Sequence, residues 1–191
     1  VPTQVNYVAK GGRLYGVGEK PAGSDSVVRR FLSLDFLWNK VRVIGGAYGG
    51  SCAFNPISGA FVFSSYRDPN LKATLDNYDA AAAWMDELVV DDAELTKAVV
   101  AAIGDLDGPM TPDTRGFVSL RHYLDGTTDE LRQQWRDEVL AATPEDFKAF
   151  STRLKAMMAD AKSSVFASAA AFDEANAELP DADKLSVTNL L

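Results

Sequence analysis

The 191-residue sequence contains one histidine, His122, and one cysteine, Cys52. A zinc peptidase motif such as H-E-x-x-H needs two histidines, and a Cys/His zinc site needs more soft ligands than these two residues supply. A Ser-His-Asp or Cys-His triad would have to use His122, but its neighbours have the spacing of an amphipathic helix. We interpret His122 as a partly exposed helical residue. The sequence predicts no metal site and no catalytic triad in this chain.

The sequence is also poor in positive charge, cysteine pairs and long apolar runs. Its 19 Lys and Arg against 27 Asp and Glu give a net charge of −8, which argues against nucleic-acid binding because phosphate contacts need clustered cations. An acidic field favours cationic partners such as basic peptides, although solubility is the simpler explanation. One cysteine excludes an internal disulfide and fits a reducing compartment. No apolar run approaches the roughly 18–20 residues that span a bilayer, so no membrane partner is expected.

The chain has the composition of an ordinary globular domain, with 47% hydrophobic and 24% charged residues. Its length suits a single domain over residues 1–191. Because it starts at Val1, without an initiator methionine or a targeting peptide, we expect a mature or excised piece of a longer protein.

Short strands are expected early in the chain and helices later. Strands are predicted over residues 3–8, 41–48, 51–54, 60–66 and 163–168, with Gly11-Gly12 ending the first. Helices are predicted over 24–37, 68–88, 115–123, 128–140 and 144–157, and from residue 91 or 92 to the break at 107–109. Strands followed by a block of helices predict an α+β fold, with an antiparallel sheet covered by helices on one face.

Several residues with chemical potential have a simpler structural interpretation. Asp68-Pro69 has the pattern of a helix start, and an ion pair between Arg67 and Asp68 would account for both charges. Three tryptophans are predicted to be core residues or packing residues between helices: Trp38, Trp84 and Trp135. Tyr78 is predicted to be a core residue.

The most informative stretch is residues 41–50, Val-Arg-Val-Ile-Gly-Gly-Ala-Tyr-Gly-Gly. A phosphate-binding loop is disfavoured, because no Gly-Lys-Ser/Thr follows and a strand comes next. Arg42 offers a charged fork of donors and Tyr48 a neutral hydroxyl. Six residues of regular strand span about 20 Å, too far for both side chains to bind one carbonyl. If they cooperate, the chain must bend at Gly45 and Gly46, which lack the Cβ that would resist bending.

Residues 37–49, 66–71 and 74–79 resemble the presequence proteases, which are organellar, peptide-degrading members of the pitrilysin/insulinase zinc metallopeptidases. The resemblance extends from about residue 3 to about residue 175. It implies a pitrilysin/processing-peptidase-like metallohydrolase domain, the last of four related α+β domains that close around a chamber in two halves. The zinc site, an inverted H-x-x-E-H, would then lie in an N-terminal catalytic domain of the same polypeptide, and the isolated chain would be inactive.

The resemblance also implies a role for the glycine-rich stretch. Arg42 and Tyr48 match the arginine and tyrosine that hold the substrate backbone beside the zinc, with Gly45 and Gly46 as a hinge between them. The implied substrates are unfolded basic peptides, especially cleaved targeting presequences, in the mitochondrial matrix or chloroplast stroma. The alternative is a non-catalytic peptide-binding or scaffold subunit of the same fold, as in processing-peptidase-like assemblies. An independent acidic peptide-binding module is supported by the charge alone.

Overall fold

A four-stranded antiparallel sheet organises the molecule, which we describe from a computed structural model over residues 3–188. The strands are β1 (Tyr7–Arg13), β2 (Gly49–Asn55), β3 (Ala60–Tyr66) and β4 (Lys162–Phe166), in the spatial order β2-β3-β1-β4. A tight turn ending at Gly59 joins β2 to β3, and the late strand β4 pairs with the other side of β1. The predicted antiparallel sheet is confirmed.

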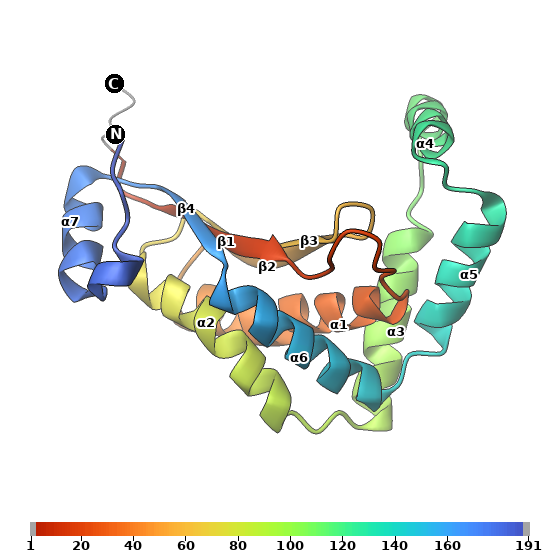
Figure 1. Ribbon diagram of the computed structural model, residues 1–191, viewed down its shortest axis with the longest axis horizontal. Helices are drawn as coiled ribbons and strands as arrows, with labels where there is room; N and C mark the ends of the chain where they lie inside the picture. Colours follow the sequence, from red (N-terminus) through yellow and green to blue (C-terminus); the bar gives the residue numbers. More distant parts are fainter. Residues whose placement is uncertain (1–2, 189–191) are drawn as a thin grey trace.

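Helices cover one face of this sheet. The helices are α1 (Ser24–Leu32), η1 (Ser33–Ile44), α2 (Lys72–Glu87), α3 (Asp92–Leu106), α4 (Pro112–Asp125), α5 (Asp129–Leu140), α6 (Pro144–Ala159), α7 (Ala169–Glu178) and the short η2 (Asp181–Asp183). Figure 1 shows α1, α2 and α6 beneath the strands, α3, α4 and α5 at one end, and α7 at the other. No helix within residues 3–188 has the length and apolar character to cross a bilayer.

The core lies between the sheet and these helices. Phe61 and Phe63 alternate with exposed Val62 in β3 and are fully buried, as the period-two pattern predicts. The ring of Phe63 stacks on Tyr78 of α2 at 5.0 Å, and Phe61 meets Phe150 of α6 edge-on at 5.7 Å. Such aromatic pairs each contribute about 0.5–1.5 kcal/mol beyond the area they bury. The prediction that Tyr78 is a core residue is confirmed.

The predicted strand over residues 41–48 is wrong. The helix that starts at Ser24 continues as a π-helix to Ile44, and β2 begins only at Gly49. Leu37 and Val41, four residues apart, are buried against the sheet, whereas Val43 and Ile44 are exposed. The β-branched run Val41-Arg42-Val43-Ile44 favours a strand locally, but a helix that is already formed gains a hydrogen bond for each added residue, and here it also buries Val41.

Three smaller predictions are also wrong. Gly11 and Gly12 lie inside β1; a Cβ on Gly11 would stand 2.3 Å from the carbonyl oxygen of Phe61, so the strands approach too closely for a side chain. The helix expected at Asp68 begins at Lys72. The predicted ion pair between Arg67 and Asp68 is absent from the ion pairs of the described residues.

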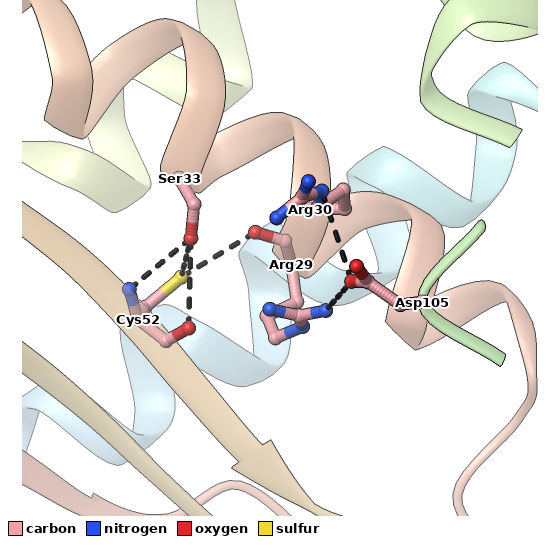
Figure 2. Close-up of polar contacts among 5 residues, drawn as sticks. All are labelled: Arg29, Arg30, Ser33, Cys52 and Asp105. Atoms are coloured by element: carbon pink, nitrogen blue, oxygen red, sulfur yellow. Dashed lines mark hydrogen bonds and ion pairs between the residues drawn. The ribbon is translucent and has the colours of Figure 1, made fainter. Parts of the chain in front are cut away.

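Polar contacts anchor the long helix to β2 (Figure 2). The backbone N–H of Cys52 donates to the Ser33 hydroxyl at 3.1 Å, and the Cys52 sulfur lies 3.2 Å from the same oxygen. One turn earlier, in α1, the Arg29 guanidinium binds Asp105 of α3 at 2.9 Å, and Arg30 lies 3.7 Å from the same carboxylate. The segment that leads into the candidate site is therefore fixed both to the sheet and to α3.

Candidate functional site

The turn between η1 and β2 carries both residues singled out from the sequence. The helix ends with the N–H groups of Gly45, Gly46 and Ala47 donating to the carbonyls of Lys40, Arg42 and Val41. Gly46 has φ +77°, a left-handed conformation that costs an L-residue with a side chain roughly 1–2 kcal/mol. Gly45 has an ordinary φ, but a Cβ there would lie 2.6 Å from the Val41 carbonyl oxygen. The chain thus turns at Gly45 and Gly46, between a helix and a strand.

Arg42 lies in the last turn of η1 and is half-buried. Its guanidinium carbon stands 3.9 Å from the centroid of the Trp38 ring, a cation–π contact one helical turn earlier. No ion pair or hydrogen bond of its guanidinium is found within residues 3–188. One face of the guanidinium is therefore held by Trp38, while its N–H edge is available to a ligand. Trp38 is 41% exposed, so of the two predicted roles, core residue or packing residue between helices, the core role is wrong; its ring packs against Arg42 of the same helix.

Tyr48 follows the turn directly. Its backbone N–H donates to the carbonyl of Arg67 at 3.3 Å, which ties it to the end of β3. Its ring packs edge-on against Tyr66 at 5.8 Å, yet the residue remains 68% exposed. Its hydroxyl has no hydrogen-bond partner in the part of the chain that the structure describes. The tyrosine is positioned by its ring and backbone, and its polar end is unpaired.

A row of aromatic side chains continues from Tyr48 across the sheet face that the helices leave uncovered. Tyr66 meets Tyr7 edge-on at 5.4 Å, and Tyr7 meets Phe166 at 5.8 Å. The guanidinium of Arg67 lies 5.7 Å from the Tyr66 ring, and Arg67 itself has φ +49°. The sequence analysis did not predict this row. The row depends on the order of the antiparallel strands, in which β3 lies between β1 and β2.

A loop after β3 supports the turn from behind. The Asn70 side chain donates to the Gly45 carbonyl oxygen at 2.6 Å. Asp68 is fully buried and accepts from the Asn70 N–H at 2.9 Å and from the Thr74 hydroxyl at 2.7 Å. Its backbone also pairs with Asn6 in both directions. Asp68 thus organises this loop and does not cap α2.

The remaining candidates lie elsewhere. His122 is half-buried on α4, as predicted for a helical histidine. Cys52 is buried, and its burial raises the pKa of the thiol to about 12. Of the described residues, none form a group of three or more His, Cys, Asp or Glu that could hold a metal ion. The site therefore offers hydrogen-bond donors and aromatic surface: a charged donor at Arg42, a neutral donor at Tyr48, and Tyr66 between Tyr48 and Arg67.

Comparison with known proteins identifies relatives over most of the chain. A profile of the family described as PreP C-terminal domain matches residues 1–170. Presequence protease 1, chloroplastic/mitochondrial, of Arabidopsis thaliana is 45% identical over 178 residues, covering 93% of this chain and 16% of that protein. Protein HypA of Clostridium perfringens is 38% identical over 154 residues, covering 81% of this chain and 16% of that protein. The chain thus spans only 16% of the length of these relatives.

A solved structure has the same fold. The inactive peptidase domain of a protein assigned as a zinc protease in Bordetella parapertussis superposes with a TM-score of 0.65 at 15% identity. The match covers 87% of this chain and 92% of that one. At this identity the likeness shows the fold alone, and it confirms the predicted peptidase-like α+β architecture.

Proposed function

The chain belongs to the PreP C-terminal domain family, and from that premise we propose that it holds the backbone of peptide substrates in a larger zinc metalloendopeptidase. Arg42 and Tyr48 are the groups that make the contact. The observation that carries this proposal is that both residues flank one turn, each is packed on an aromatic ring, and each has an unpaired polar end. Donors held in this way are prepared for a ligand before it arrives.

The chemistry of peptide hydrolysis gives these donors a use. Negative charge develops on the carbonyl oxygen of the bond that breaks, and donors aimed at it from a water-excluded site stabilise the transition state. Removing one such donor commonly reduces the rate by roughly 10²–10³, or about 3–4 kcal/mol. Arg42 and Tyr48 bind a carbonyl without contacting a side chain. Recognition of the backbone alone is consistent with an enzyme that degrades many unfolded peptides.

The metal of the parent enzyme belongs to another domain in this proposal. Residues 3–188 do not fit a zinc site: the Cys52 thiol is buried against Ser33, and His122 stands on α4. No chemical step is therefore assigned to a metal in this chain. Its contribution is to orient the peptide and, by closing over the chamber, to exclude water.

The proposed substrates are basic, unfolded peptides such as cleaved targeting presequences. The Arabidopsis relative is named a chloroplastic/mitochondrial presequence protease, and the net charge of −8 suits cationic peptides. We propose a location in the mitochondrial matrix or chloroplast stroma, supported by the words chloroplastic/mitochondrial in the name of that relative.

The test uses the parent enzyme with Arg42→Ala and Tyr48→Phe. We expect kcat/KM for an unstructured peptide to fall roughly 10²–10³-fold in Arg42→Ala and less in Tyr48→Phe, because a charged donor contributes more than a neutral one. The melting temperature should change little, since neither polar end forms a hydrogen bond within residues 3–188 and Arg42→Ala loses only the partly exposed contact with Trp38, worth about 0.5–1 kcal/mol. Arg13→Ala is the matched control, because Arg13 is an exposed arginine at the far end of β1. Unchanged kinetics in both site variants would refute the assignment.

A second candidate is a non-catalytic peptide-binding or scaffold subunit of the same fold. The inactive Bordetella peptidase domain, with the same fold, is the observation in its favour. This alternative predicts that Arg42→Ala weakens peptide binding without any change in the turnover of a catalytic partner. Binding and turnover measured on the same variant separate the two functions.

A further inference from the structure

Helix α4 carries an apolar stripe that the domain does not cover. Phe117, Leu120, Tyr123 and Leu124 recur at helical spacing and form one side of the helix, the α4 stripe. Phe117 is 67% exposed and Tyr123 is 83% exposed, and no residue of α4 is buried. In Figure 1, α4 stands beyond the ends of α3 and α5, away from the sheet.

Helix α4 presents its apolar side to solvent and its other side to the body of the domain, the reverse of an ordinary surface helix. Val118 and His122, four residues apart, are the α4 residues that are half-buried, so they mark the side facing the body. The α4 stripe lies on the other side. Helix α6 shows the usual arrangement, since its apolar residues Phe147, Phe150 and Leu154 are buried in the core. An amphipathic helix gains nothing from exposing its apolar side in an isolated domain.

We propose that the α4 stripe is the surface on which this domain docks against another domain of the same polypeptide. The relatives that match this chain are far longer, since it covers only 16% of each, so most of the parent chain lies outside the structure. A covalently linked partner has an effective concentration in the millimolar range. Covalent linkage thus lowers the interface area that a lasting contact between the two domains needs. This inference rests on the proposed function only in taking the chain as one domain of a longer protein.

Two other occupants fit the stripe less well. A stable interface between separate chains buries about 800 Å² on each partner, more than four side chains on one helix provide. A membrane surface binds helices rich in Lys and Arg. Helix α4 instead balances Arg115 and Arg121 with Asp113 and Asp125.

The test is thiol labelling of the full-length parent protein with a maleimide, read out for each peptide by mass spectrometry. Leu120→Cys places a thiol in the α4 stripe. Arg115→Cys places one on the exposed body-facing side of the same helix, and Val89→Cys places one in an exposed loop. We expect Leu120→Cys to react at least about tenfold more slowly than both controls, because a docked surface must open before it reacts. Phe117→Cys, at a second position in the stripe, should behave in the same way.

Three results would overturn the proposal. Equal labelling rates at Leu120→Cys and the controls would show that the stripe is free. Protection that grows with protein concentration would show a second copy as the occupant. Protection that appears only with added phosphatidylserine vesicles would show a membrane. Labelling requires no turnover, so inert Arg42 and Tyr48 variants would refute the proposed substrate role and leave this test intact.

Discussion

The side-chain amide of Asn70 donates a 2.6 Å hydrogen bond to the carbonyl oxygen of Gly45. This contact joins the loop after β3 to the turn between Arg42 and Tyr48. The buried carboxylate of Asp68 fixes this loop, because it accepts hydrogen bonds from the Asn70 N–H and the Thr74 hydroxyl. The position of the proposed peptide contact therefore depends on residues that never touch the peptide.

Replacing Asn70 tests this dependence. Asn70→Ala should lower the free energy of unfolding by about 1 kcal/mol, the usual net contribution of one hydrogen bond. It should also lower kcat/KM of the parent enzyme by about tenfold or more, because small displacements of positioning groups have large kinetic effects. Asn77→Ala, at a half-buried site in α2, is the control and should leave kcat/KM unchanged. A loss of stability at Asn70→Ala with unchanged kcat/KM would show that the loop does not position the site.

Alanine substitutions at three glycines test three different physical effects on stability. Gly46→Ala should destabilise the domain by roughly 1–2 kcal/mol, because alanine is strained at φ +77°. Gly45→Ala should cost more, since its Cβ would stand 2.6 Å from a backbone oxygen. Gly104→Ala, in α3 with nothing within 4 Å, should stabilise by about 0.5–1 kcal/mol. Urea unfolding of the three variants should give this order, and equal effects at Gly45 and Gly104 would contradict the close approach in the turn.

Local signals in the sequence predicted much of the helical half of the fold. Asp91 caps α3 as expected, with its carboxylate accepting from the Glu94 N–H and the Glu94 side chain returning to the Asp91 N–H. Thr128 likewise caps α5 by accepting from the Leu131 N–H. Helix caps can be predicted from the sequence because the donor and the acceptor lie within one helical turn of each other.

The errors occur where distant contacts override local preference. Val41 is in a helix because it packs beneath β2, where a Cβ on Gly50 would come within 2.9 Å of the Val41 side chain. Asp68 has the sequence of a helix cap, but its carboxylate is bound by Asn70 and Thr74. Arg42 and Tyr48 were identified through resemblance to a family. The rings that hold them, Trp38 and Tyr66, became visible only once helix and sheet were in place.

A buried carboxylate gives the stability of the domain a specific pH dependence. Asp25 is 5% exposed, accepts from the Tyr15 hydroxyl at 2.7 Å, and has its pKa raised above the ordinary value by burial. The native state therefore binds a proton more readily than the unfolded chain. Between the unfolded pKa of about 3.9 and the raised native pKa, this group makes the free energy of unfolding fall as pH rises.

The variant Asp25→Asn removes that titration. The stability of wild type relative to Asp25→Asn should increase as pH falls from 7 to 4, which urea unfolding at several pH values measures. Asp173→Asn, at an exposed aspartate of α7, is the control for general charge effects. A difference between wild type and Asp25→Asn that stays constant with pH would contradict a raised pKa at Asp25.

The last prediction concerns how η1 protects the edge of the sheet. β2 is an edge strand, and the Cys52 N–H finds its partner in the Ser33 hydroxyl of η1 instead of another strand (Figure 2). With its pKa raised to about 12 by burial, the Cys52 thiol should not react with a disulfide reagent at pH 8 until the domain opens. Ser33→Ala leaves that N–H without a partner, at a cost of about 1–3 kcal/mol. Labelling of Cys52 should then become about 5–150-fold faster, because the open state becomes more populated by the same free energy. Ser163→Ala in β4, an exposed serine, should leave the rate unchanged. Rapid labelling of the native wild-type chain would refute the buried contact, since a free edge and an accessible thiol would then already be present.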